Sequence, residues 1–460
     1  MIISLPRRAV LSAALGVAGT RLLASSPAFA MTPSVPHQPG IATPQQPFLY
    51  FIAFDLTAEK RQDVAALMRR WSMAADALMA GRPVPGFVDP QDAEGLSAKG
   101  LTLTFGFGPG LFLKDGKDRY NLAAWRPAPL ADLPRFNGDQ LVPAHTGGDL
   151  CIQSCAGDPQ TAFHAIRVLA ALAYDTATPR WAQTGFMPSF GKGKTPRNLM
   201  GFKDGTINPD IDDPKVADRV LWAAPDDLPW MQGGTYLVAR IIRMALEHWD
   251  RMKVGFQEQT MGRQKQSGAP IGGHREFEPL TLKQMDKDGN PVTAQGAHAR
   301  LAAPEENEGA QILRRAYAYD NGLSYVAERW PPWRQGNEFD AGLMFLAYQQ
   351  DPRTGFTKIF ERMSKFDMMN QFTTHVGGGL FACPRRASRA DVGPRRLGAD
   401  MAGVKACWRW LGLAGVKLLA SCAHAPPPQR PAPPKNAFRQ FDPPSPGVAN
   451  RPQLNLGGEY

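Results

Sequence analysis

The chain is poor in cysteine, with five in 460 residues. Exported proteins that rely on a disulfide framework use cysteine far more densely, so this chain is not a disulfide scaffold. It also lacks the paired C-x2-C spacing of zinc sites, so we expect no metal held by a cysteine cluster. Cys151 and Cys155 lie on a segment predicted to be a strand, where side chains four residues apart are too distant to bond. We therefore expect Cys155 to belong to the core.

The body of the chain lacks net charge, although the whole sequence has 52 basic and 42 acidic residues. The excess lies in three arginines near the N-terminus and in residues 385–460, which hold 12 basic and 4 acidic side chains. Between Met31 and Pro384 there remain 37 basic and 38 acidic residues. A body without a positive field has no electrostatic footprint for a polyanion, so we expect no nucleic-acid partner.

Long apolar runs are also missing. The run Val10 to Gly19 is well short of the ~20 residues that span a bilayer, which disfavours the alternative of a membrane anchor. Arg7-Arg8 precede this run, and Ala28-Phe29-Ala30 is typical of a cleavage site. These features predict that residues 1–30 are a twin-arginine signal peptide. The mature protein is then periplasmic, with no membrane span.

A nine-residue stretch in the middle of the chain, Gly201 to Pro209 (GFKDGTINP), is dense in turn-forming residues. By local rules it is a sharply turned loop, and a surface turn is the simpler interpretation. In the alternative, Gly201 and Gly205 let the backbone lie close to a flat ligand, while Asp204 presents a charged group to it. The local sequence leaves both interpretations open.

Around this loop the pattern of apolar residues predicts two similar units. The first, residues 48–200, follows an irregular lead-in (31–47), and the second covers residues 201–384. Thr57 and Asp158 are the predicted helix N-caps of the first unit. The predicted strands are Phe48–Leu56, Leu101–Phe107, Asp149–Ala156, Arg180–Met187, Thr235–Met244, Gly342–Gln349 and Thr373–Phe381, and the predicted helices are Glu59–Met79, Asp158–Tyr174, Ala245–Met252 and Asp351–Met363.

Two split βαβ units predict an α+β body whose antiparallel sheets pack face to face beside an apolar space. The second unit contains a long stretch predicted to be irregular, Gly262 to Asp320, with His274 and His298. Loops of that length inside a compact body are usually functional.

After Pro384 the composition changes abruptly. Residues 385–460 contain 11 prolines and predict a disordered or polyproline tail. Met401 to Ala423 has the pattern of a short apolar helix, but three interrupting basic residues argue against a membrane span. A reading-frame change in the gene is another hypothesis for this segment.

Several motifs, taken together and in this order, resemble those of the dye-decolourising peroxidases, most closely their twin-arginine-exported deferrochelatase/peroxidase branch. The resemblance covers roughly residues 47–384. The matching segments are GFKDGTINP from Gly201, GGTYLVARIIRMALEHWDR from Gly233, His298-Ala299-Arg300, Ile312 to Arg315, DAGLMFLAYQQDP from Asp340 and QFTTHVGGGLFACP from Gln371. The resemblance implies a dimeric α+β barrel of two ferredoxin-like halves that enclose a pocket for one haem b per chain.

The resemblance also implies roles for individual residues. His298 is the expected axial ligand of the haem iron, Asp204 the distal acid/base and Arg314 the distal arginine. Arg315 is adjacent to Arg314, so on an extended segment only one of them faces the pocket. Asp340 is the candidate partner for the second ring nitrogen of His298. The remaining residues expected beside the haem are Gly201, Phe202, Gly205 and His375.

These residue types suit the chemistry. Splitting hydrogen peroxide on iron needs a group that takes a proton from one oxygen and returns it to the other, and a carboxylate does both. An arginine stabilises the charge that develops as the bond breaks. The resemblance implies an oxoferryl intermediate that oxidises a bulky phenolic, dye-like or porphyrin donor. Because an ordinary aspartate has a pKa of about 3.9, an acidic optimum is expected.

Two departures from the family pattern stand out: Ala303-Pro304 replaces the usual Asn-Pro, and Ala316 offers no polar side chain. Aromatic residues such as Trp330, Trp333 and Tyr319 either relay electrons to the surface or pack in the core. The alternative function is haem and iron handling with incidental peroxidase activity, in which haem is cargo or is stripped of its iron. Its partners would belong to an iron-uptake system. A homodimer is expected from the resemblance.

Overall fold

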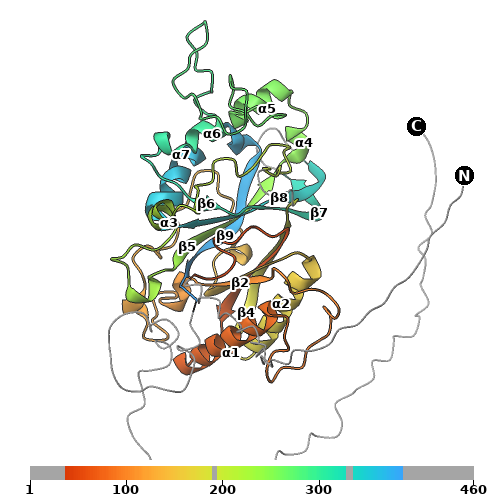
Figure 1. The fold of residues 1–460 in the computed structure, drawn as a ribbon, viewed down its shortest axis with the longest axis vertical. Coiled ribbons are helices and arrows are strands. Elements are labelled where there is room, and N and C mark those ends of the chain that lie inside the picture. The colour runs from red at the N-terminus through yellow and green to blue at the C-terminus, as the bar shows by residue number, and fades with distance from the viewer. Residues whose placement is uncertain (1–36, 189–193, 328–334, 387–460) are drawn as a thin grey trace, which may run out of the picture. The chain divides into compact units, whose positions relative to one another are not determined.

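The computed structural model describes residues 37–188, 194–327 and 335–386 (Figure 1). The predicted signal peptide, nearly all of the predicted tail, Trp330 and Trp333 lie outside these residues. Contacts divide the chain into two units, and every described residue belongs to the first, residues 1–414.

The N-terminal half has the predicted order strand, helix, strand, strand, helix, strand. Its sheet has the order β4-β1-β3-β2 and is antiparallel throughout, as in a ferredoxin-like unit. The Asp158 side chain caps the second helix by accepting from two backbone N–H groups, as predicted, but the first helix begins after Lys60 with no side-chain cap, so Thr57 is not its cap. The elements are β1 (Phe48–Leu56), α1 (Arg61–Met79), β2 (Thr102–Phe107), β3 (Leu150–Ala156), α2 (Pro159–Ala173) and β4 (Ala177–Phe186).

The C-terminal half repeats this topology, because its main strands have the order β7-β8-β5-β9. The elements are α3 (Pro214–Val220), β5 (Thr235–Met244), α4 (Leu246–Trp249), α5 (Val254–Met261), α6 (His298–Leu301), β6 (Leu313–Arg314), β7 (Tyr317–Ala327), β8 (Gln335–Gln349), α7 (Lys358–Phe366) and β9 (Thr373–Cys383). A π-helical turn, Arg353–Thr357, precedes α7.

Part of the stretch predicted to be irregular is ordered. It contains α6, β6 and the start of β7, and β8 begins seven residues before the predicted Gly342. The outer parts of β7 and β8 pair with each other, with Leu323 opposite Phe339, and both of these side chains are exposed. A hairpin that projects from the core needs no alternation of buried and exposed residues, so the period-two pattern failed to predict it.

The two half-sheets join along both edges. One register pair, Phe107 with Ala382, links β2 to β9, and another, Phe186 with Ala318, links β4 to β7. Gln38 reinforces the first junction, because its amide donates to the carbonyls of Phe105 and Pro384. The result is an antiparallel sheet closed into a barrel, which confirms the predicted α+β fold.

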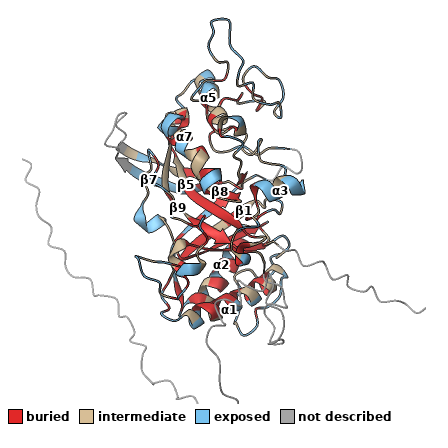
Figure 2. Cartoon of the chain, turned by 90° about the vertical axis from the view of Figure 1, so that its left-hand side faces the viewer, coloured by how far each residue is buried: buried red, intermediate tan, exposed pale blue. Residues whose placement is uncertain are grey.

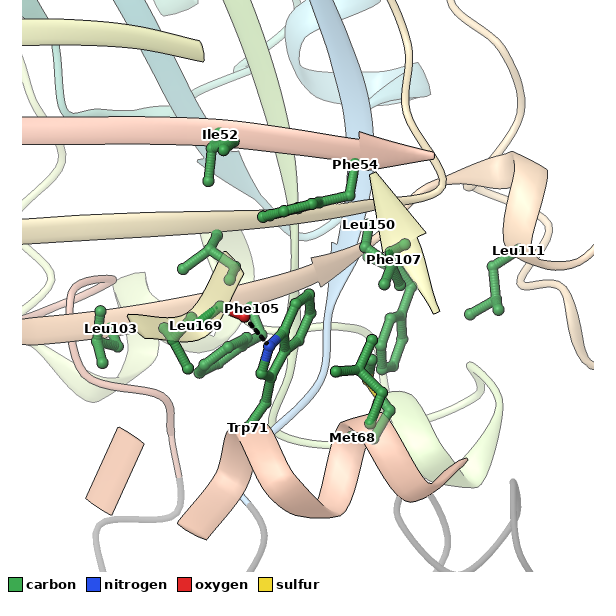
Figure 3. Close-up of a cluster of buried hydrophobic side chains, with 14 of the residues drawn as sticks. Ile52, Phe54, Met68, Trp71, Leu103, Phe105, Phe107, Leu111, Leu150 and Leu169 are labelled. Atoms are coloured by element: carbon green, nitrogen blue, oxygen red, sulfur yellow. Dashed lines mark hydrogen bonds between the residues drawn. The ribbon is translucent and has the colours of Figure 1, made fainter. Parts of the chain in front are cut away.

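The strands bury both of their faces. On β1, Ile52 and Phe54 pack against the helices, whereas Leu49 and Phe51 pack toward strands of the other half. Figure 3 shows the helix-side cluster, in which Trp71 of α1 donates its indole N–H to the carbonyl oxygen of Leu169 over 2.7 Å. Figure 2 shows the central strands as buried and the outer faces of several helices as exposed.

The three cysteines in the described residues, Cys151, Cys155 and Cys383, are buried and unbridged, which confirms that Cys155 belongs to the core. Among the described helices, none combines the length and the apolar character needed to cross a membrane.

Candidate active site

A cavity of ≈ 220 Å³ lies in the C-terminal half between the sheet and helices α6 and α7. Ile242 and Leu343 line it from β5 and β8, whereas their neighbours Ile241 and Met344 face the barrel interior. The cavity therefore lies on the outer, helix-covered face of the sheet. Its walls are mostly apolar, and the apolar lining residues include Met244, Phe345, Phe356, Ile359, Phe360 and Met363.

His298, the first residue of α6, lines this cavity, and its Nδ1 lies 2.7 Å from Oδ2 of Asp367. Asp367 is itself fixed, because its Oδ1 accepts a hydrogen bond from the backbone N–H of Met369 and its side chain is 2% exposed. Burial lowers the pKa of His298, but the charge of Asp367 and its hydrogen bond outweigh this effect, so that the pKa is raised. With Nδ1 engaged, Nε2 is the ring nitrogen left to bind a metal.

The prediction that Asp340 is the carboxylate partner of His298 is wrong. Asp340 lies on the projecting part of β8, where it accepts a hydrogen bond from Asn321. The true partner, Asp367, follows α7 immediately and caps the next short helical turn, Met368–Gln371. The sequence contained a signal for it, since an aspartate at a helix boundary is a typical N-cap, but that signal does not indicate a histidine partner.

Asp204 and Arg314 both line the cavity and contact each other. Nη1 of Arg314 donates to Oδ1 of Asp204 over 3.1 Å, and the two side chains are 27% and 20% exposed. Asp204 is held by its backbone, whose N–H donates to the carbonyl oxygen of Pro196. The structure thus brings Asp204, Arg314 and His298 to one cavity, as the resemblance implied.

Arg315 points the other way. Its guanidinium donates to the carbonyl oxygens of Thr43 and Pro44 and to the Gln46 side chain, and the residue is 4% exposed. Adjacent side chains of an extended segment take opposite sides, which explains why only Arg314 reaches the cavity. Arg315 instead ties the lead-in before β1 to the C-terminal half.

The other residues predicted beside the cofactor divide into two groups. Gly205 lines the cavity, whereas Gly201 and Phe202 are not among its lining residues. Phe202 is buried against the ring of Trp249. Gly201 has φ 84°, and a Cβ there would lie 2.8 Å from Cε of Lys265, so glycine is required by the turn and by that neighbour.

His375 of β9 lines the cavity and is the neutral member of the site. Burial and the nearby Arg240 lower its pKa to about 3. Its Nδ1 is buried and has no hydrogen-bond partner, and its ring lies 4.4 Å from that of Phe360. A buried polar atom without a partner beside an apolar cavity indicates that a ligand completes the site.

A second, smaller opening of ≈ 50 Å³ is also lined by Asp204 and Arg314. Its other lining residues include Gln45, Phe186, Met187, Asn208, Ala316 and Ala318. Ala316, one of the departures noted in the sequence, therefore leaves this opening wider than a polar side chain would.

The donor set suits a flat metal macrocycle. An imidazole with a free Nε2 and a carboxylate–guanidinium pair share one cavity, and the walls between them are apolar. Neutral imidazole held by a carboxylate is a typical axial ligand for haem iron.

Comparisons with known proteins agree with this geometry. The family model "Dyp-type peroxidase, N-terminal" matches residues 38–187 and "Dyp-type peroxidase, C-terminal" matches residues 195–388. A dye-decolorizing peroxidase of Thermobifida fusca is 39% identical over 380 residues, which is 79% of this chain and 83% of the relative. A deferrochelatase of Escherichia coli K12 is 34% identical over 361 residues, which is 75% of this chain and 81% of the relative.

Solved structures give the same result. A DyP-type peroxidase from Streptomyces coelicolor has a TM-score of 0.71 at 38% identity and matches 77% of this chain and 93% of its own. Ferric DtpA from Streptomyces lividans has a TM-score of 0.69 at 38% identity and matches 76% of this chain and 92% of its own. The chain therefore belongs to the Dyp-type peroxidase family.

Proposed function

We propose that the chain is a haem-dependent peroxidase that reduces hydrogen peroxide and oxidises bulky phenolic or dye-like donors. The observation that carries this proposal is the meeting of His298, held by Asp367, with Asp204 and Arg314 at one apolar cavity. One haem b per chain would occupy the cavity, with Nε2 of His298 as the axial ligand.

Bound haem would supply the iron and the electrons that peroxide reduction needs. Asp204 takes the proton from the peroxide oxygen that binds and returns it to the oxygen that leaves as water. Arg314 donates hydrogen bonds to the leaving oxygen and stabilises its developing negative charge. The apolar walls exclude bulk water, which strengthens both effects.

The smaller opening suits the smaller of the two reactants. Peroxide, which is little larger than water, fits the ≈ 50 Å³ opening beside Asp204. A bulky donor does not fit there, and haem would fill the larger cavity, so the electrons of the donor would reach the haem through the protein. Of the aromatic residues named above as electron relays or core residues, Tyr319 is buried in β7.

The cellular location and the partners of the enzyme are also part of the proposal. Arg7-Arg8 and the short apolar run support export of the folded protein to the periplasm by the twin-arginine route. A homodimer and partners in an iron-uptake system are the expected associations, supported by the resemblance alone.

The second candidate is a haem- and iron-handling protein, because relatives at 34% identity are named deferrochelatase. That function does not require the acid–base pair Asp204 and Arg314 beside the bound group. Incubation with haem and peroxide, followed by measurement of free iron, metal-free porphyrin and oxidised phenol, distinguishes the two functions. Porphyrin and iron released without oxidised phenol would favour the second.

The primary test is spectroscopic. The purified protein is expected to show a Soret band, or to gain one on addition of haem, and to consume peroxide with a phenolic donor. His298→Ala is expected to lose the axial-ligand spectrum, whereas His274→Ala, which changes an exposed histidine of the long loop, is expected to keep it. An unaltered spectrum in His298→Ala would reject this ligand.

A further inference from the structure

One residue of the loop that carries Asp204 has contacts that the proposed function does not use. Nδ2 of Asn208 donates to the carbonyl oxygen of Arg314 over 2.8 Å, and Oδ1 of Asn208 accepts from the backbone N–H of Arg314 over 3.1 Å. A single side-chain amide thus satisfies both backbone groups of one residue, 106 positions away.

The position of Arg314 in the sheet explains why it needs this partner. β6 is an edge strand whose only strand partner in the described part of the chain is β8, and the neighbouring Arg315 donates its N–H to the carbonyl oxygen of Leu346 on that side. Backbone groups of successive strand residues alternate in direction, so those of Arg314 point away from β8. Without Asn208 they would be unpaired.

A primary amide suits this place because it carries a donor and an acceptor on one plane, as a peptide group does. Aspartate retains an oxygen that accepts from the N–H of Arg314. Its second oxygen, however, faces the carbonyl oxygen of Arg314 and repels it. Alanine removes both bonds. The amide of Asn208 therefore acts as one residue of a missing neighbouring strand.

The consequence concerns the separation of Asp204 and Arg314. Asp204 lies four residues before Asn208, and Arg314 is the residue that Asn208 holds. Among the described residues, the hydrogen bonds between loop 201–209 and residues 313–316 are the two of Asn208 and the Asp204–Arg314 contact itself.

The other contacts of this loop run elsewhere. Lys203 and Thr206, on either side of Asp204, both bind the carboxylate of Glu276 in the long loop after α5. Those contacts orient Asp204 with respect to the long loop and do not involve Arg314. Within the part of the chain that the structure describes, Asn208 is the one residue of this loop whose side chain hydrogen-bonds to the backbone of Arg314.

We propose that Asn208 is a positioning residue that fixes the backbone of Arg314 against the loop of Asp204, and so sets the distance between the two groups that act on peroxide. The proposal rests on the proposed function for its kinetic consequence. Its structural part concerns the backbone of Arg314 and stands independently of catalysis.

The test uses the haem-loaded protein with Asn208→Ala, Asn208→Asp, Arg314→Leu and the double variant Asn208→Ala/Arg314→Leu. Asn290→Ala, in an exposed turn of the long loop, is the matched control. Backbone amide exchange of peptides that cover residues 313–316 is measured by mass spectrometry, together with kcat/KM for peroxide.

In Asn208→Ala we expect faster exchange at Arg314 and a ~10- to 100-fold lower kcat/KM for peroxide, the size of loss that a small misplacement causes. Asn208→Asp should recover part of the exchange protection, because its oxygen still accepts from the N–H of Arg314. In the Arg314→Leu background, loss of Asn208 should lower kcat/KM no further, because its effect acts through Arg314.

Two results would overturn the proposal. Unchanged amide exchange at residues 313–316 in Asn208→Ala would show that the side chain of Asn208 does not hold the backbone of Arg314. An equal loss of kcat/KM in both backgrounds would show that Asn208 acts by another route. If Arg314→Leu instead keeps full peroxide activity, the proposed role of Arg314 fails, while the exchange data still decide whether Asn208 holds its backbone.

Discussion

Oδ2 of Asp367 lies 2.7 Å from Nδ1 of His298, and the same carboxylate accepts from the backbone of Met369 through its other oxygen. The histidine is therefore oriented by a group that is itself fixed by a helical turn. This arrangement makes the imidazole a stronger electron donor to any metal on Nε2.

Asp367→Asn is expected to raise the reduction potential of bound haem iron and to weaken haem binding by ~10- to 100-fold, because a neutral amide makes His298 less basic. Asparagine keeps an oxygen for the N–H of Met369, so the turn should persist. Spectroelectrochemistry and haem transfer to an acceptor protein measure both effects. Asp340→Asn is the control, and a shift of equal size there would contradict the assignment.

Asp204→Ala is expected to lower kcat/KM for peroxide by ~10²- to 10⁴-fold, the usual contribution of a positioned acid–base group. Stopped-flow absorbance of the haem-loaded protein follows the reaction with peroxide. Asp210→Ala, six residues later and exposed, should react as the unmodified protein does. A normal rate in Asp204→Ala would remove this residue from the mechanism.

The adjacent arginines are expected to fail in different ways. Arg314→Leu should lower peroxide reactivity by ~10²-fold or more with little change in the unfolding midpoint, because its guanidinium lies at the cavity. Arg315→Leu should destabilise the fold by about 2–4 kcal/mol, because it leaves the acceptor oxygens of Thr43, Pro44 and Gln46 without their hydrogen-bond donor.

Urea titration and peroxide kinetics on both arginine variants separate the two roles. The roles would be reversed if Arg315→Leu lost activity at unchanged stability. Arg69→Leu, at an exposed arginine of α1, provides a comparison for the loss of any single guanidinium.

His375 makes stability depend on pH in the cofactor-free protein. Its pKa is about 3 in the fold against 6.5 as the ordinary value, through burial and the nearby Arg240. Between these values the unfolded chain binds a proton that the folded chain does not. Stability from this residue is therefore complete above about pH 6.5 and falls toward pH 3, by up to about 1.4 kcal/mol per pH unit.

His375→Gln should remove this contribution. The difference in unfolding free energy between the two proteins, measured in urea at several pH values from 7 to 4, isolates it from other titrating groups. A difference that stays constant across this range would contradict the expected burial of a neutral imidazole.

The sequence predicted those parts of the fold that depend on short-range pattern. Apolar runs located Phe48–Leu56 and Thr235–Met244, which the structure reproduces residue for residue. Asp158-Pro159 predicted a helix start because capping is decided within one turn. The projecting ends of β7 and β8 were missed, because no buried face imposes a period on them.

At the site, the order of motifs in the sequence brought Asp204, His298 and Arg314 together as candidates. The turn-forming residues of Gly201–Pro209 predicted that Asp204 lies in a sharply turned loop. The tertiary structure decided the rest. It replaced Asp340 by Asp367, directed Arg315 into the lead-in and gave Asn208 a partner. Each of these contacts joins residues far apart in the chain, so it depends on how two sheets and their helices pack, which no local pattern records.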